Sequence, residues 1–118
     1  MIAKKLILAI AVTLAGASAA HAATRTVLVD NDRLTIFKLE FAPGEVQATL
    51  HPPPGTGQIV TLITPADVKN NFNTDGVPSS ENGRLEPGKT WWLSKTTLHQ
   101  FGNASATTPY SVIVTTLK

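Results

Sequence analysis

Cysteine is absent from the 118-residue chain. This absence excludes disulfide bonds, metal sites built from thiolates, and a cysteine nucleophile. It also excludes a blue-copper centre, which requires a cysteine sulfur. A domain of this sequence must therefore fold on its core and its hydrogen bonds, without covalent cross-links.

Histidine is scarce, with only His21, His51 and His99 in the chain. A Ser-His-Asp triad would have to use one of them as its base. Neither His51 nor His99 stands beside a serine in a pattern typical of an activated nucleophile. The sequence therefore does not predict a serine hydrolase.

An excess of charge of one sign is also missing. The formal net charge of +2 counts Lys4 and Lys5 near the N-terminus. Without these two, the ten Lys and Arg become eight, against eight Asp and Glu. The basic residues form no cluster or stripe, so the sequence gives no reason to expect a nucleic acid partner.

Residues 1–22 have the pattern of a secretory signal peptide. Lys4 and Lys5 form a basic start, and the apolar run over 6–17 is too short to span a bilayer. Ala20-His21-Ala22 then fits a cleavage site before Ala23. We expect a periplasmic or secreted protein with no membrane attachment after cleavage.

Residues 18–20 fit a second processing site, and cleavage there would leave His21 as the N-terminus. An N-terminal histidine can chelate copper through its amine and imidazole, with a second histidine completing the site. A copper-binding protein therefore stays open as a further hypothesis, and the mass of the mature chain would decide it.

The chain after residue 22 shows β-strand patterns and no amphipathic helix period. One all-β domain over 23–118 follows, either a sandwich or a closed barrel. The number of strands favours a double-sheet jelly roll, and an immunoglobulin-like sandwich stays open. The predicted strands cover 26–29, 33–41, 46–51, 58–64, 68–72 (an edge strand followed by a loose hairpin connection), 91–93, 98–103 and 110–117.

His99, Phe101 and Asn103 alternate along one predicted strand, so the three side chains share a face. A histidine, a ring and an amide on one face of a rigid strand are typical of a polar site inside a small β-barrel. Trp91 and Trp92 must point to opposite faces, which predicts one core residue and one residue at the pocket or an interface.

The segment from Gly88 to Asn103 resembles the second sequence motif of the cupin family. Gly88, His99 and Asn103 hold the motif's glycine, histidine and asparagine at the expected spacing. The turn at 94–96 is Ser-Lys-Thr, where cupins usually have proline and glycine. The resemblance extends over most of residues 33–117 and implies a cupin-like double-stranded β-helix, the jelly-roll barrel.

The first cupin motif is degenerate. Pro43-Gly44 matches its opening, but His51 alone stands where two histidines are usual, and Gln58 holds the place of the glutamate. Cupins with both motifs bind Fe, Mn, Ni or Zn through three histidines and one glutamate. The resemblance thus implies His51, Gln58 and His99 as metal ligands, with weak affinity because the carboxylate is gone.

Two functions therefore compete. The first is an exported protein that binds a small ligand in the barrel and lacks a complete metal site. The second is a metal-dependent cupin enzyme, an oxygenase or isomerase of a small organic acid, which uses His51, Gln58 and His99. Small cupins are often homodimers, so a homodimer is expected as well. The residues predicted to contact the ligand are Val60, Leu62, Trp92, Phe101 and Asn103.

Overall fold

Eight β-strands form the regular structure of residues 23–118, the part of the chain that the computed structural model describes. The predicted signal peptide over 1–22, both cleavage sites and His21 lie outside the described residues. Within 23–118 there is no helix that could cross a membrane. The strands are β2 (Thr24–Asp30), β3 (Leu34–Phe41), β4 (Gly57–Leu62), β5 (Ala66–Thr74), β6 (Val77–Leu85), β7 (Thr90–Ser94), β8 (Thr97–Gln100) and β9 (Tyr110–Leu117).

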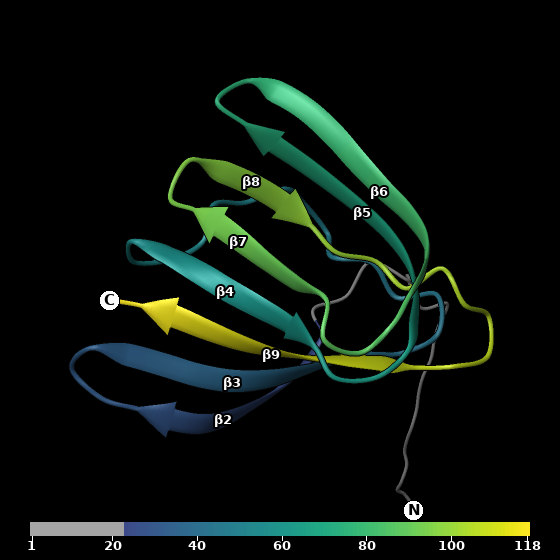
Figure 1. The fold of residues 1–118 in the computed structure, drawn as a ribbon, viewed down its shortest axis with the longest axis horizontal. Helices are drawn as coiled ribbons and strands as arrows, with labels where there is room; N and C mark the ends of the chain where they lie inside the picture. The colour runs from purple at the N-terminus through teal and green to yellow at the C-terminus, as the bar shows by residue number, and fades with distance from the viewer. Residues whose placement is uncertain (1–22) are drawn as a thin grey trace, which may run out of the picture.

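The strands form two antiparallel sheets, one of five strands in the order β2-β3-β9-β4-β7 and one of three in the order β6-β5-β8. A short turn after Ser94 joins β7 to β8, so the two sheets follow one another around a curved surface (Figure 1). The prediction of an all-β domain is confirmed for the described residues.

The register of the five-stranded sheet places successive rows of side chains on its inner face. One row runs through Phe37 on β3, Val114 on β9 and Val60 on β4, which are direct neighbours. All three are at least 95% buried. Because side chains alternate along a strand, the next inward row along the strands contains Leu39 and Val112. These rows form one wall of the barrel interior.

One end of this interior is filled by a stacked pair of rings. Phe41 and Tyr110 lie with their centroids 4.8 Å apart, and both side chains are fully buried. The Tyr110 hydroxyl donates a hydrogen bond to the carbonyl oxygen of Gly102. Since an offset aromatic pair adds about 1 kcal/mol to the burial of its area, this pair fixes β3 against β9 at one end of the barrel.

The prediction for residues 65–83 was wrong. Instead of an edge strand and a loose connection, β5 and β6 form a regular hairpin over nine paired residues, and β5 also pairs with β8. The hairpin turns at Asp75 and Gly76, both of which have positive φ. Asp-Gly is the preferred sequence for a two-residue turn of this kind, so the turn sets the register of the hairpin.

The prediction of a strand over 46–51 was also wrong. This segment makes only two isolated bridges, Val46 with Gly102 and His51 with His99. The prolines at 52–54 lack N–H donors and cannot extend a ladder from its end. The segment nevertheless runs along β8 and its continuation, and this pairing places His51 beside His99.

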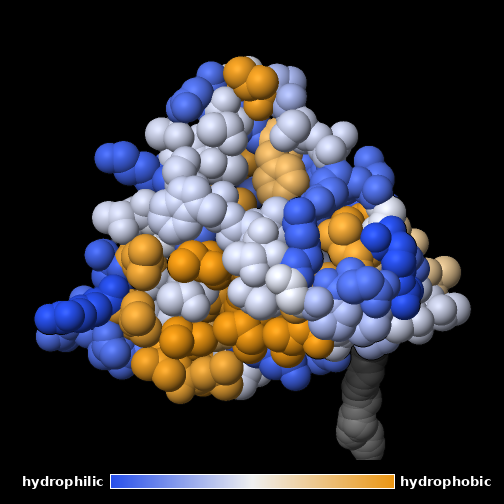
Figure 2. Space-filling model, viewed as in Figure 1, coloured by the Kyte–Doolittle hydropathy of each residue, from blue (hydrophilic) through white to orange (hydrophobic). Residues whose placement is uncertain are grey.

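The outer face of the five-stranded sheet is partly apolar. Figure 2 shows hydrophobic side chains gathered over the region of β2, β3, β9 and β4. Four of the most exposed large apolar residues of the described chain belong here: Val27, Leu28, Val29 and Ile59. β2 is the edge strand of this sheet, and its pairing shifts by one residue between Val27 and Val29.

Gly55 seats the loop that precedes β4 against the C-terminal strand. Its φ of 69° lies in the left-handed region, and a Cβ added there would collide with the carbonyl oxygen of Leu117. That oxygen also accepts a hydrogen bond of 2.9 Å from the N–H of Thr56. Only glycine combines this backbone conformation with this close approach.

We predict that Gly55→Ala lowers the free energy of unfolding by at least about 3 kcal/mol, because it adds a steric clash to an unfavourable φ. Gly44→Ala is the matched control, since Gly44 has a φ of 78° and open space around it. It should cost only about 1 kcal/mol. Urea denaturation of both variants measures the difference, and equal costs would contradict the role of Gly55.

Candidate functional site

The barrel encloses a cavity of about 410 Å³. Its buried wall comes from the inward rows of the five-stranded sheet and from β8, and exposed residues of β2 and the 47–54 segment form its rim. This volume lies at the lower end of the range for small-molecule sites. The lining residues are Ala23, Arg25, Phe37, Leu39, Gln47, Ala48, Thr49, His51, Pro54, Gln58, Val60, His99, Phe101, Val112 and Val114.

His51 and His99 meet in this cavity. Their ring centroids are 4.5 Å apart and their planes are inclined at 66°. The backbone holds them there, because the N–H of each residue donates to the carbonyl oxygen of the other, at 3.4 and 3.2 Å. His99 is 4% exposed, whereas His51 is exposed at the rim. The sequence prediction that the two histidines share a site is therefore confirmed in their position.

The buried imidazole of His99 has an unsatisfied ring nitrogen. Its Nδ1 atom is shielded from solvent and has no hydrogen-bond partner among the described residues. Burial, and next the nearby His51, lower the pKa of His99 from 6.5 to about 4. His99 is therefore neutral at pH 7, with one ring nitrogen available as an acceptor and the other as a donor.

Gln58 also lines the cavity, and its amide is already partly engaged. The Nε2 atom donates a buried hydrogen bond of 2.9 Å to the hydroxyl of Thr116 on β9. This contact orients the amide along the wall of the barrel. Gln58 thus lies in the same cavity as the two histidines, and its fixed dipole can serve a polar group on a ligand.

The five predicted ligand contacts divide in two. Val60 and Phe101 line the cavity, and the ring of Phe101 lies 5.5 Å from that of His99. Leu62, Trp92 and Asn103 are not among the lining residues. Leu62 is fully buried in the core, and Trp92 is 57% exposed because the alternation along β7 turns Trp91 inward instead.

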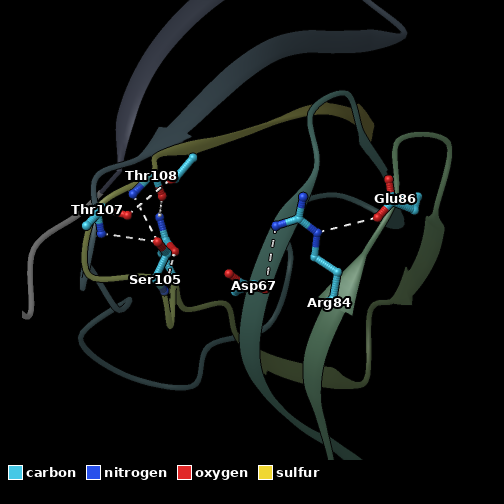
Figure 3. Close-up of polar contacts among 7 residues, drawn as sticks. Asp67, Arg84, Glu86, Ser105, Thr107 and Thr108 are labelled. Carbon is cyan, nitrogen blue, oxygen red and sulfur yellow. Dashed lines mark hydrogen bonds and ion pairs between the residues drawn. The ribbon is translucent and has the colours of Figure 1, made fainter.

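Asn103 stabilises a loop. Its Nδ2 atom donates to the carbonyl oxygens of Phe41 and Thr108, and its Oδ1 atom accepts from the N–H of Ser105. Figure 3 shows how this loop closes: the Ser105 hydroxyl accepts from the backbone N–H groups of Thr107 and Thr108. The asparagine of the second motif therefore fixes the connection between β8 and β9.

Arg25 is the lining residue that the sequence did not suggest. It pairs with Leu39 across β2 and β3, so its side chain shares the inward face. Its guanidinium carbon lies 3.9 Å from the ring centroid of Phe37. The predicted strand began at Thr26 and left Arg25 out. Its two-residue spacing from Val27 was the available signal.

Comparison with solved structures identifies the fold. No protein-family model and no curated protein sequence matches the chain. The chain resembles a cupin domain from Bordetella pertussis Tohama I, with a TM-score of 0.63, 21% identity, and coverage of 82% of this chain and 94% of that one. A cupin superfamily protein from Desulfitobacterium hafniense DCB-2 gives a TM-score of 0.58, 18% identity... and coverage of 80% and 75% is discussed with it below.

The identity given in the preceding sentence needs correcting. The Desulfitobacterium hafniense protein is 16% identical to this chain, with a TM-score of 0.58 and coverage of 80% of this chain and 75% of that one. A recombinant oxalate oxidase in complex with glycolate gives a TM-score of 0.63 at 16% identity, and the match covers 80% of this chain and 50% of that one.

The chain has a cupin fold. At these identities the likeness establishes the architecture of the cupin barrel and no activity. It agrees with the jelly-roll prediction and rules in favour of that barrel over the immunoglobulin-like sandwich. The details of the two sequence motifs rest on the residues themselves, since no family model matches.

The low pKa of His99 makes the stability of this cupin barrel depend on pH. In the unfolded chain His99 takes up a proton near pH 6.5, but in the folded chain only near pH 4. Stability is therefore complete above pH 6.5 and is lost as the pH falls from 6.5 to 4, by up to about 3 kcal/mol.

We predict that His99→Gln removes this part of the pH dependence. Urea denaturation at several pH values should give a shallower slope for the variant than for the wild type, and both proteins carry the same carboxylates. His51→Gln, the control, should have an intermediate slope because it removes only the neighbouring imidazole. Parallel slopes for the wild type and His99→Gln would contradict the assignment.

Proposed function

We propose that this chain is an exported cupin-fold protein that binds a small molecule in the barrel cavity and lacks a complete metal site. The observation that carries the proposal is the buried, unpartnered Nδ1 atom of His99 in the cavity wall. A buried polar atom without a partner is unfavourable, and a ligand can supply the missing hydrogen bond.

The rest of the cavity supports the same proposal. Its wall is mainly apolar, with Phe37, Val60, Phe101 and the inward valines of β9. A few polar groups, those of His51, Gln58 and His99, converge on this apolar space. Small-molecule sites combine these two features, because the apolar wall supplies affinity and the polar groups fix orientation. Export is supported by the leader pattern of residues 1–22.

The donor set fits a tightly held metal ion poorly. His51, His99 and Gln58 offer two imidazoles and a neutral amide, and the amide already donates to Thr116. The described residues contain no group of three His, Cys, Asp or Glu side chains that could hold a metal ion. The one charged residue among those lining the cavity is a cation, Arg25. A divalent ion would therefore lack compensating negative charge.

Weak binding of a divalent ion by His51 and His99 is the second candidate, and the distance of 4.5 Å between their rings favours it. We expect that Zn²⁺ or Ni²⁺ added to metal-free protein shifts the NMR signals of both imidazoles only at high ion concentration. Elemental analysis provides the opposing test. A full equivalent of Fe, Mn, Ni or Zn that survives dialysis and is lost in His99→Gln would favour the metal-dependent oxygenase or isomerase.

Ligand binding is tested by narrowing the rim of the cavity. Ala48 is an exposed lining residue, so Ala48→Trp should obstruct the cavity while leaving the core intact. We predict that it weakens the binding of small aromatic compounds at least about tenfold, or about 1.4 kcal/mol, in ligand-observed NMR.

Ala106→Trp is the matched control, because Ala106 is exposed and does not line the cavity. It should bind the same compounds as the wild type. Binding that is absent from the wild type, or that is equally affected by both substitutions, would contradict a binding role for the cavity.

A further inference from the structure

Arg25 is the one charged side chain among the residues that line the cavity. The register of the sheet puts it there, because Arg25 pairs with Leu39, and Leu39 pairs with Val112 on β9. Leu39 and Val112 both line the same cavity. The guanidinium therefore extends from the rim over the inner face of the sheet, next to an apolar wall.

The Arg25 guanidinium has no carboxylate partner among the described residues, since no ion pair within 4.0 Å includes it. Arg84 on β6 provides the contrast. It lies between Asp67 and Glu86, with N–O distances of 3.7 and 3.4 Å (Figure 3). The charge of Arg84 is thus compensated within the fold, whereas that of Arg25 is left for a ligand.

The contact that Arg25 does make leaves its hydrogen bonds free. Its guanidinium carbon lies 3.9 Å from the centroid of the Phe37 ring, so the ring supports the cation through its face. A guanidinium held in this way keeps its N–H donors directed along its own plane, where a carboxylate can accept two of them. Phe37 thereby serves as a platform for the cation.

The interior beyond Arg25 determines the rest of the ligand. The buried wall presents the rings of Phe37 and Phe101 and the side chains of Val60, Val112 and Val114. No Asp or Glu is among the lining residues that would repel an anion. Farther inside, the neutral imidazole of His99 offers an unpartnered Nδ1 atom.

We propose that the cavity binds a small monocarboxylate with an apolar, ring-sized body, and that Arg25 holds the carboxylate at the rim while the body occupies the buried wall. This inference rests on the proposed function, because it assigns a chemical class to the ligand of the same cavity. It adds Arg25 as a binding residue that determines specificity.

The test compares acids with their neutral amides. Phenylacetate and phenylacetamide have nearly the same shape, and cyclohexanecarboxylate and its carboxamide form a second pair. NMR titration of the wild-type protein at low salt should give an affinity about fivefold to tenfold higher for each acid than for its amide. Arg25→Gln should abolish this preference and leave the affinity for the amides unchanged.

Lys38→Gln is the matched control. Lys38 is exposed on the neighbouring strand, and it is one residue from Phe37, so it faces outward. Its loss removes the same charge and should leave the preference for acids intact. A preference that falls equally in both variants would show a general effect of net charge and would overturn the role of Arg25.

The remaining outcomes separate this inference from the proposed function. If acids and amides bind the wild type equally well, the carboxylate assignment fails while the binding role of the cavity stands. If neither acids nor amides bind, both fail. If acids are preferred and Arg25→Gln retains the full preference, the cavity binds carboxylates through other groups, and the assignment of Arg25 is overturned.

Discussion

The full-length pairing of β9 with both of its neighbours is the constraint on which the rest of the structure depends. β9 pairs with β3 along its whole length and with β4 over six residues. Its inward side chains supply Tyr110 to the stacked pair, Val112 and Val114 to the cavity wall, and Thr116 to the amide of Gln58. Because one strand sets these positions together, the core and the cavity share a single register.

The sequence predicted much of the fold because alternation and turn residues are local signals. The strand at 110–117 matches β9, and β3 differs by one residue at its start. The failures were non-local. Segment 46–51 has a strand pattern, but its partner residues at 99–103 bridge it at only two points. The Asp75-Gly76 turn was a local signal for a regular hairpin that was read too loosely.

The site was predictable to a similar extent. His51, Gln58 and His99 share the cavity, as the motif resemblance implied. The sequence could not distinguish the cavity wall from the rest of the inner face, because inward residues such as Leu62 differ from Val60 only in their position along the barrel. Arg25 was missed because a charge on an edge strand ordinarily faces water. Only the register with Leu39 places it on the inner face.

The position of β2 has a consequence for how the cavity exchanges its contents. β2 is paired on one side only, every one of its residues is exposed, and its register is interrupted between Val27 and Val29. Such a strand separates from its sheet at a much lower free energy than the barrel as a whole. Since Arg25 belongs to β2, local fraying of this one strand opens the rim and removes the cation together, so the gate of the cavity and its charge are the same element.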